Sequence, residues 1–120
     1  MRIIAPLAAA WLGLAALPAA AQVNPFRGAT TALGATDSAM FWSSVEKLNR
    51  LPDLAVGSST SWRDSATGSS GENRVTGVSR RNGMTCHTVR HQLLIKGRTP
   101  PSVFNVTWCL APDGAWKIAS

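Results

Sequence analysis

The stretch between the two cysteines of the chain, Cys86 and Cys109, constrains the fold more than any other part of the sequence. It contains an apolar run that ends at Ile95, a short turn at Gly97-Arg98, and a second apolar run from Val103 to Trp108. Two apolar runs separated by a short turn are typical of a β-hairpin. With one cysteine at each outer end, the pattern predicts a hairpin closed by a disulfide.

The turn sets the register of this hairpin. A two-residue loop Gly97-Arg98, with glycine first as in a type II′ turn, pairs Lys96 with Thr99, so the numbers of opposed residues sum to 195. The numbers of the two cysteines have the same sum, so they lie opposite each other, with Cβ atoms roughly 4.5–5.5 Å apart and close enough for a disulfide. Pro100-Pro101 weakens the pairing near the turn, and a wider loop is the alternative.

The same register gives the hairpin two different faces, because successive residues of a strand point to opposite sides of a sheet. The cysteines share their face with polar residues, namely Thr88, Arg90, Asn105 and Thr107. The other face is more apolar, and we expect Trp108 to lie there beneath a helix. Its expected neighbours in the core are Val89, Phe104 and Val106.

The segment before the strands has helical spacing. Thr36 or Asp37 is suited to cap its start, and Pro52 ends it after Arg50 in the last turn. The apolar positions that predict its buried stripe are Met40, Phe41, Val45 and Leu48, with Trp42 as a further candidate. We expect this stripe to pack on a sheet, whereas a surface for a partner is the alternative.

Strands and turns follow from Gly57 onward. Strands are predicted at residues 59–64 and 72–81, and Asn82-Gly83 is the strongest hairpin signal in the chain, a type I′ turn. The central hairpin comes next, and a turn at Pro112-Asp113-Gly114 leads to a last strand at residues 116–118. The predicted fold class is α+β, with one N-terminal helix packed on an antiparallel β-meander of about five strands and one cross-strand disulfide.

The N-terminus is typical of a secretory signal peptide. Arg2 precedes a nearly unbroken apolar run, and Ala19-Ala20-Ala21 fits the small-residue cleavage rule. A membrane anchor is the alternative, but a span needs about 20 apolar residues and this run is shorter. The predicted organisation is a signal peptide at 1–21, a flexible arm at 22–35 and one α+β domain at 36–120. The expected location is the periplasm or envelope of a Gram-negative-type bacterium, where a disulfide persists.

Candidates for catalysis are few. His87 and His91 share a strand face but are about 13 Å apart along a straight strand, too far to bind one metal ion, and we expect them at the surface or the edge of the core. Cys86 is better explained by a disulfide than as a nucleophile beside His87. Trp62, Trp108 and Trp116 are expected in the core, with sugar stacking as the alternative. We expect no enzymatic activity, cofactor or metal.

Basic residues are the candidates for binding a partner. The formal net charge is +6, and removing the predicted signal peptide with Arg2 leaves +5. A basic exported chain is attracted to anionic envelope components, and without a nucleic-acid motif we expect no nucleic-acid partner. A solvated surface with no ligand is the alternative. The candidate anion-binding residues are Arg80, Arg81, Arg90, Lys96 and Arg98.

A set of ordered motifs resembles the C-terminal domain of the bacterial 17 kDa surface-antigen family. The matching residues run from Trp62 to Ile118 and are Trp62-Arg63-Asp64, Gly68, Gly71, Cys86, Gly97-Arg98, Cys109 and Asp113-Gly114-Ala115-Trp116. The chain lacks the lipid-carrying cysteine and the glycine-rich membrane-inserting stretch of that family. The resemblance implies a non-catalytic protein of the cell envelope or outer membrane. The alternative function is a periplasmic inhibitor or ligand-binding protein that uses a basic sheet face.

Overall fold

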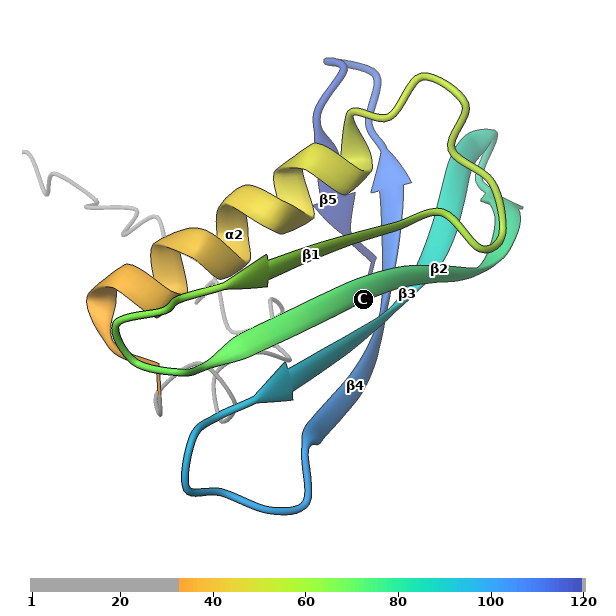
Figure 1. The fold of residues 1–120 in the computed structure, drawn as a ribbon. Helices are drawn as coiled ribbons and strands as arrows, with labels where there is room; N and C mark the ends of the chain where they lie inside the picture. Colours follow the sequence, from red (N-terminus) through yellow and green to blue (C-terminus); the bar gives the residue numbers. More distant parts are fainter. Residues whose placement is uncertain (1–32, 120) are drawn as a thin grey trace, which may run out of the picture.

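A computed structural model describes residues 33–119 as one helix packed on one five-stranded antiparallel sheet. The strands follow one another in the order β1-β2-β3-β4-β5, and the sheet curls around the helix (Figure 1). The predicted α+β fold class and its disulfide are therefore confirmed. The predicted signal peptide and all but the end of the predicted arm lie outside the described residues.

Helix α2 spans Ala35–Asn49. It begins after Gly34, which makes no side-chain cap, so the predicted capping role of Thr36 or Asp37 is wrong. Asp37 instead lies buried in the first turn, where its carboxylate accepts a hydrogen bond of 2.8 Å from the Thr67 hydroxyl. The buried stripe contains Phe41, Val45 and Leu48 as predicted, whereas Met40 and Trp42 lie partly exposed on its flanks.

The five strands are β1 Ser59–Arg63, β2 Ser70–Arg81, β3 Met84–Leu94, β4 Ser102–Leu110 and β5 Trp116–Ile118. Between β3 and β4 the predicted register holds at every pair, from Cys86 opposite Cys109 to Leu93 opposite Ser102. The two-residue turn does not form, and residues 95–101 make a wider loop. Pro100 and Pro101 lack the N–H groups that would extend the ladder toward Gly97.

The β2–β3 hairpin has the predicted turn and one irregularity. Asn82 and Gly83 have φ angles of 49° and 77°, the positive values that a type I′ turn requires. Pairing runs from Arg81 opposite Met84 to Gly77 opposite Thr88, and then shifts so that Val75 lies opposite Val89. The extra residue, Thr76, forms a β-bulge, and the residues of β2 before it face the opposite side from where an unbroken ladder would place them.

The sheet has an inner face toward α2 and an outer face away from it. The inner face and the helix form one core, in which Trp108 is 7% exposed and packs with Val89 and Val106 as predicted. Phe104 is partly buried at its margin. The other buried core side chains are Phe41, Val45, Leu48, Trp62, Val75 and Leu93.

The Cys86–Cys109 disulfide lies on the outer face and joins β3 to β4, with the two Cα atoms 4.1 Å apart. Both cysteines are nevertheless buried. Residues 33–119 contain no helix with the length and hydrophobicity of a membrane span.

Candidate functional site

The outer face is the principal polar surface of the sheet. Its register positions come from all five strands, and they carry positively charged side chains in excess over negatively charged ones. Within residues 33–119 the cations at these positions are Arg63, Arg74, Arg81, Arg90 and Lys117, and the acid is Glu72. Lys117 forms an ion pair of 3.3 Å with Asp113 in the preceding loop.

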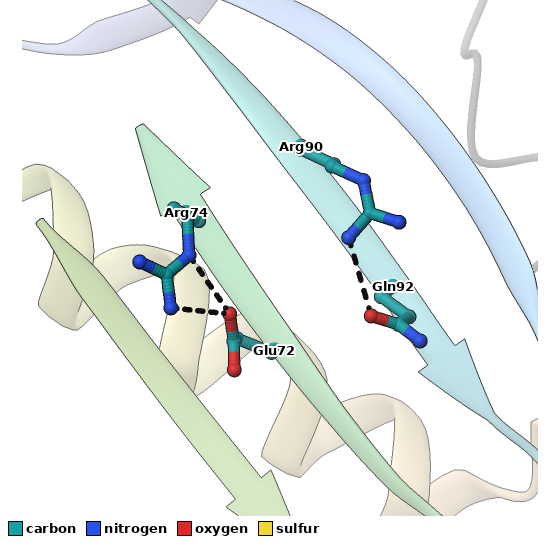
Figure 2. A network of polar contacts seen from close by, with 4 residues as sticks. All are labelled: Glu72, Arg74, Arg90 and Gln92. Atoms are coloured by element: carbon teal, nitrogen blue, oxygen red, sulfur yellow. Dashed lines mark hydrogen bonds and ion pairs between the residues drawn. The ribbon is translucent and has the colours of Figure 1, made fainter. Parts of the chain in front are cut away.

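Two arginines lie directly opposite each other at the centre of this face. Arg74 of β2 pairs in register with Arg90 of β3, and the next outward-facing pair along the strands is Glu72 with Gln92. Figure 2 shows these four side chains on the near side of the strands, with the helix behind them. Opposed like charges destabilise a sheet, so this arrangement needs neutralising contacts.

The neutralising contacts are unequal. Glu72 Oε1 accepts a hydrogen bond of 3.1 Å from Arg74 Nε and forms an ion pair of 3.1 Å with Arg74 Nη2. Arg90 donates from Nη1 to the uncharged Oε1 of Gln92 at 3.2 Å. No carboxylate within residues 33–119 lies within ion-pair distance of Arg90. Arg90 therefore keeps a positive charge that its described neighbours do not balance.

A shallow hollow adjoins this pair of arginines. It has a volume of about 400 Å³ and opens beside Arg63, Glu72 and Gln92. Its remaining lining residues are Ser61, Trp62, Ser70, Gly71 and Leu94. Hydroxyl, amide and carboxylate groups together provide both donors and acceptors, which suits a ligand with hydroxyl groups.

The structure separates the five residues predicted to bind an anion. Arg90 is central on the outer face, and Arg81 lies on the same face at the tip of the β2–β3 hairpin. Arg80 is also at that tip, but at a position of the other face, and donates to the Gly83 carbonyl at 3.2 Å. Lys96 and Arg98 lie in the loop at the opposite end of β3.

The histidines lie in the core, contrary to the predicted surface or edge position. His91 is 0% exposed and accepts a hydrogen bond of 3.5 Å at Nε2 from the Trp108 indole. Its Nδ1 therefore carries the proton and donates to Asn73 Oδ1 at 2.7 Å. Asn73 in turn donates to the Ser44 hydroxyl of the helix at 2.8 Å and to Thr60 of β1 at 3.3 Å. This chain of hydrogen bonds fixes the helix to four strands.

His87 lies on the same inner face. Its Nε2 is 2.7 Å from Asn49 Oδ1, and its ring centre is 4.3 Å from that of Trp116. Burial lowers the pKa of His87. Burial, and secondarily the nearby His87, lowers the pKa of His91 to about 4. Both rings are therefore neutral at pH 7 and serve the core, and no three His, Cys, Asp or Glu side chains of the described chain gather to hold a metal ion.

Several motif residues have local structural roles at the β1–β2 turn. Asp64 accepts a hydrogen bond from the Ala66 backbone N–H at 2.9 Å, and this contact, followed by one with Asp37, lowers the pKa of Asp64. Gly68 has a φ of +76°, in the left-handed region that favours glycine. A Cβ on Gly71 would lie 2.4 Å from the indole nitrogen of Trp62. These residues shape the turn and fasten it to the helix.

Arg74 and Arg63 also belong to the outer face, although they are not among the five residues predicted from the sequence. Arg63 follows Trp62 in an alternating strand, so its outward direction was available from the pattern once Trp62 was assigned to the core. Arg74 had no such signal, because the bulge at Thr76 decides its face. No family model, curated protein or solved structure matches this chain. The function is therefore inferred from the surface itself.

Proposed function

We propose that the chain is an exported, non-catalytic protein of the cell envelope that binds an anionic envelope component through the outer face of its sheet. The observation that carries this proposal is the excess of positive charge on that face, above all the unbalanced charge of Arg90 opposite Arg74. Clustered cations on an exposed surface attract polyanions over the distance of the Debye length.

Three further points support the proposal. The Cys86–Cys109 disulfide suits an oxidising compartment outside the cytoplasm, in agreement with the signal-peptide pattern of residues 1–21. The histidines, the best candidates for acid–base chemistry, are buried and hydrogen-bonded in the core. The resemblance to the 17 kDa surface-antigen family leads to the same envelope role.

A second candidate function, a periplasmic ligand-binding or inhibitor protein, is favoured by the hollow of about 400 Å³ beside Arg63. This volume falls within the range of small-molecule sites, roughly 300–1,000 Å³. The hollow is shallow and shares Glu72 with the arginine pair, so we assign it to the same binding surface.

The test is association with isolated envelopes as a function of salt. The wild-type protein should sediment with envelopes at 0.1 M salt and be released at 1 M, because the Debye length falls from about 10 Å to about 3 Å. The variant R74Q/R81Q/R90Q should lose this association. The control R50Q/R80Q/R98Q removes the same charge from the end of α2, the other face of β2 and the β3–β4 loop, and should keep the association. Equal behaviour of the two variants, or association that salt does not change, would contradict the proposal.

A further inference from the structure

The arginine pair lies within a polar band that crosses four strands. The row through Arg74 and Arg90 continues to Ser59 on β1 and Asn105 on β4. The next row toward the hollow contains Ser61, Glu72 and Gln92, and it ends on β4 at the exposed Val103. Neighbouring strands of a sheet are about 4.8 Å apart, so the two guanidinium groups of the central row have a hydroxyl on one side and an amide on the other, each one strand away.

The positive charges of this band are complementary to a ligand with spaced anionic groups. Arg74 is held by Glu72, and Arg90 is held only by an amide among the described residues. A carboxylate or sulfate placed between the two guanidinium groups would relieve their mutual repulsion and accept charge-assisted hydrogen bonds from both. Arg63, on the rim of the hollow, provides a second attachment point on the same face.

The uncharged polar groups of the band can form hydrogen bonds with hydroxyl groups on the same ligand. Asn105 is exposed beside Arg90, Gln92 is partly exposed, and Ser61 lines the hollow. Amide side chains are both donors and acceptors, as sugar hydroxyls are. The outward-facing positions of the described strands carry no aromatic side chain, and Trp62, which lines the hollow, is only 7% exposed. Single-stranded nucleic acid binds by stacking on exposed aromatic side chains, so it fits this face less well.

We propose that the outer face is a binding site for an acidic polysaccharide that lies across the strands. Arg74 and Arg90 bind its anionic groups, whereas Gln92, Asn105 and Ser61 bind its hydroxyls, and one sugar unit occupies the hollow beside Arg63. The proposal rests on the proposed function, which requires an anionic partner, and assigns the chemical class of that partner.

The experiment measures binding of the purified protein to polygalacturonate, a polymer of uronic acids, by titration calorimetry at 0.1 M salt. Inorganic polyphosphate, neutral dextran and vesicles containing phosphatidylglycerol are the comparison ligands. We expect binding to polygalacturonate and none to dextran. R74Q/R90Q should weaken binding about tenfold or more through the loss of charge-assisted hydrogen bonds. R50Q/R80Q, with the same net charge, should bind within about twofold of wild type.

A second variant separates sugar recognition from attraction by charge alone. Q92A/N105A keeps every charge and should weaken binding to polygalacturonate while leaving binding to polyphosphate unchanged. The polysaccharide assignment is overturned if Q92A/N105A binds polygalacturonate as tightly as wild type. It is also overturned if polyphosphate or vesicles bind and polygalacturonate does not. In both cases the proposed anionic partner stands. If no anionic ligand binds and envelope association is also absent, both proposals are overturned. Circular dichroism of each variant checks that the fold is intact.

Discussion

At the scale of single residues, His91 is the side chain whose charge state matters most to the fold. Its Nε2 faces the Trp108 N–H, which is only a donor, and its Nδ1–H faces an acceptor on Asn73. A second proton would therefore place two donors against each other in a fully buried site. The neutral ring is the form that the core accepts, as its pKa of about 4 indicates.

This lowered pKa predicts that the protein loses stability in mildly acidic solution. The ordinary histidine pKa of 6.5 applies to the unfolded chain, so the unfolded state binds the proton first as the pH falls. The contribution of the neutral His91 to stability is fully present above its unfolded-state pKa of 6.5 and is lost as the pH falls toward 4. Between pH 7 and pH 5 the free energy of unfolding should fall by about 2 kcal/mol from His91 alone, and His87 acts in the same direction.

Urea unfolding at the two pH values measures this loss. His91→Gln, which has no imidazole, should show a smaller difference between pH 7 and pH 5 than wild type, although it will be less stable at both. The chain has only two histidines, so their ring proton signals can be followed directly by NMR. A titration of His91 near pH 6.5 in the folded protein would contradict the assignment.

Gly71 offers a prediction about packing at a single residue. An added Cβ would lie 2.4 Å from Trp62 Nε1 and 2.8 Å from the Gln92 carbonyl oxygen, both too close. Gly71→Ala should therefore lower the free energy of unfolding by about 1–3 kcal/mol, as overpacking does. Gly77→Ala is the matched control, because it is in the same strand and has nothing within 4 Å of the added atom. Thermal unfolding of both variants measures the difference in stability. Equal destabilisation by the two substitutions would contradict the predicted clash at Gly71.

At the scale of elements, the hairpins show what the sequence could predict. Alternation and the cysteine spacing determine the β3–β4 register, and Asn82-Gly83 determines the tip of β2–β3. The register of that tip, continued without interruption, would place Arg74 opposite His91 on the inner face. The bulge at Thr76 turns Arg74 outward and Asn73 inward. No local sequence pattern predicts this bulge. The pairing of Arg74 with Arg90 and the Asn73–His91 hydrogen bond therefore could not be predicted.

The disulfide gives the prediction for the β3–β4 hairpin. It links residues separated by 23 positions, and closing a loop of this size in the unfolded chain is worth about 3 kcal/mol. The double variant C86S/C109S should unfold at a markedly lower temperature than the oxidised wild type. Thiol titration of the native wild type should find no free thiol. Wild type treated with a reductant should unfold at a temperature close to that of the double variant, and a large gap between them would indicate that serine itself perturbs the site.

At the scale of the whole molecule, the two faces of the sheet have different roles. The inner face holds the apolar core and the buried histidines, whereas the outer face carries the arginines and the disulfide. The sequence predicted this division on β3 and β4, where alternation is regular. It did not predict how the basic residues group, because Lys96 and Arg98 lie in the loop after β3, where no register fixes direction, and because the bulge at Thr76 decides the face of Arg74.

The N-terminal segment and the disulfide are linked, because a disulfide forms in the compartments to which a signal peptide directs a chain. If residues 1–21 are a cleaved signal peptide, the exported protein begins at Gln22 and its mass is that of residues 22–120 less two hydrogen atoms. The same residues 22–120 produced in a reducing cytoplasm should lack the disulfide. The free energy of unfolding of that form should be lower by about 3 kcal/mol. This is a large share of the total for a small domain, which is roughly 5–15 kcal/mol. Intact mass spectrometry and thermal unfolding of both preparations test this. An exported form that keeps Met1 and Arg2, or equal melting temperatures, would contradict the link between export and stability.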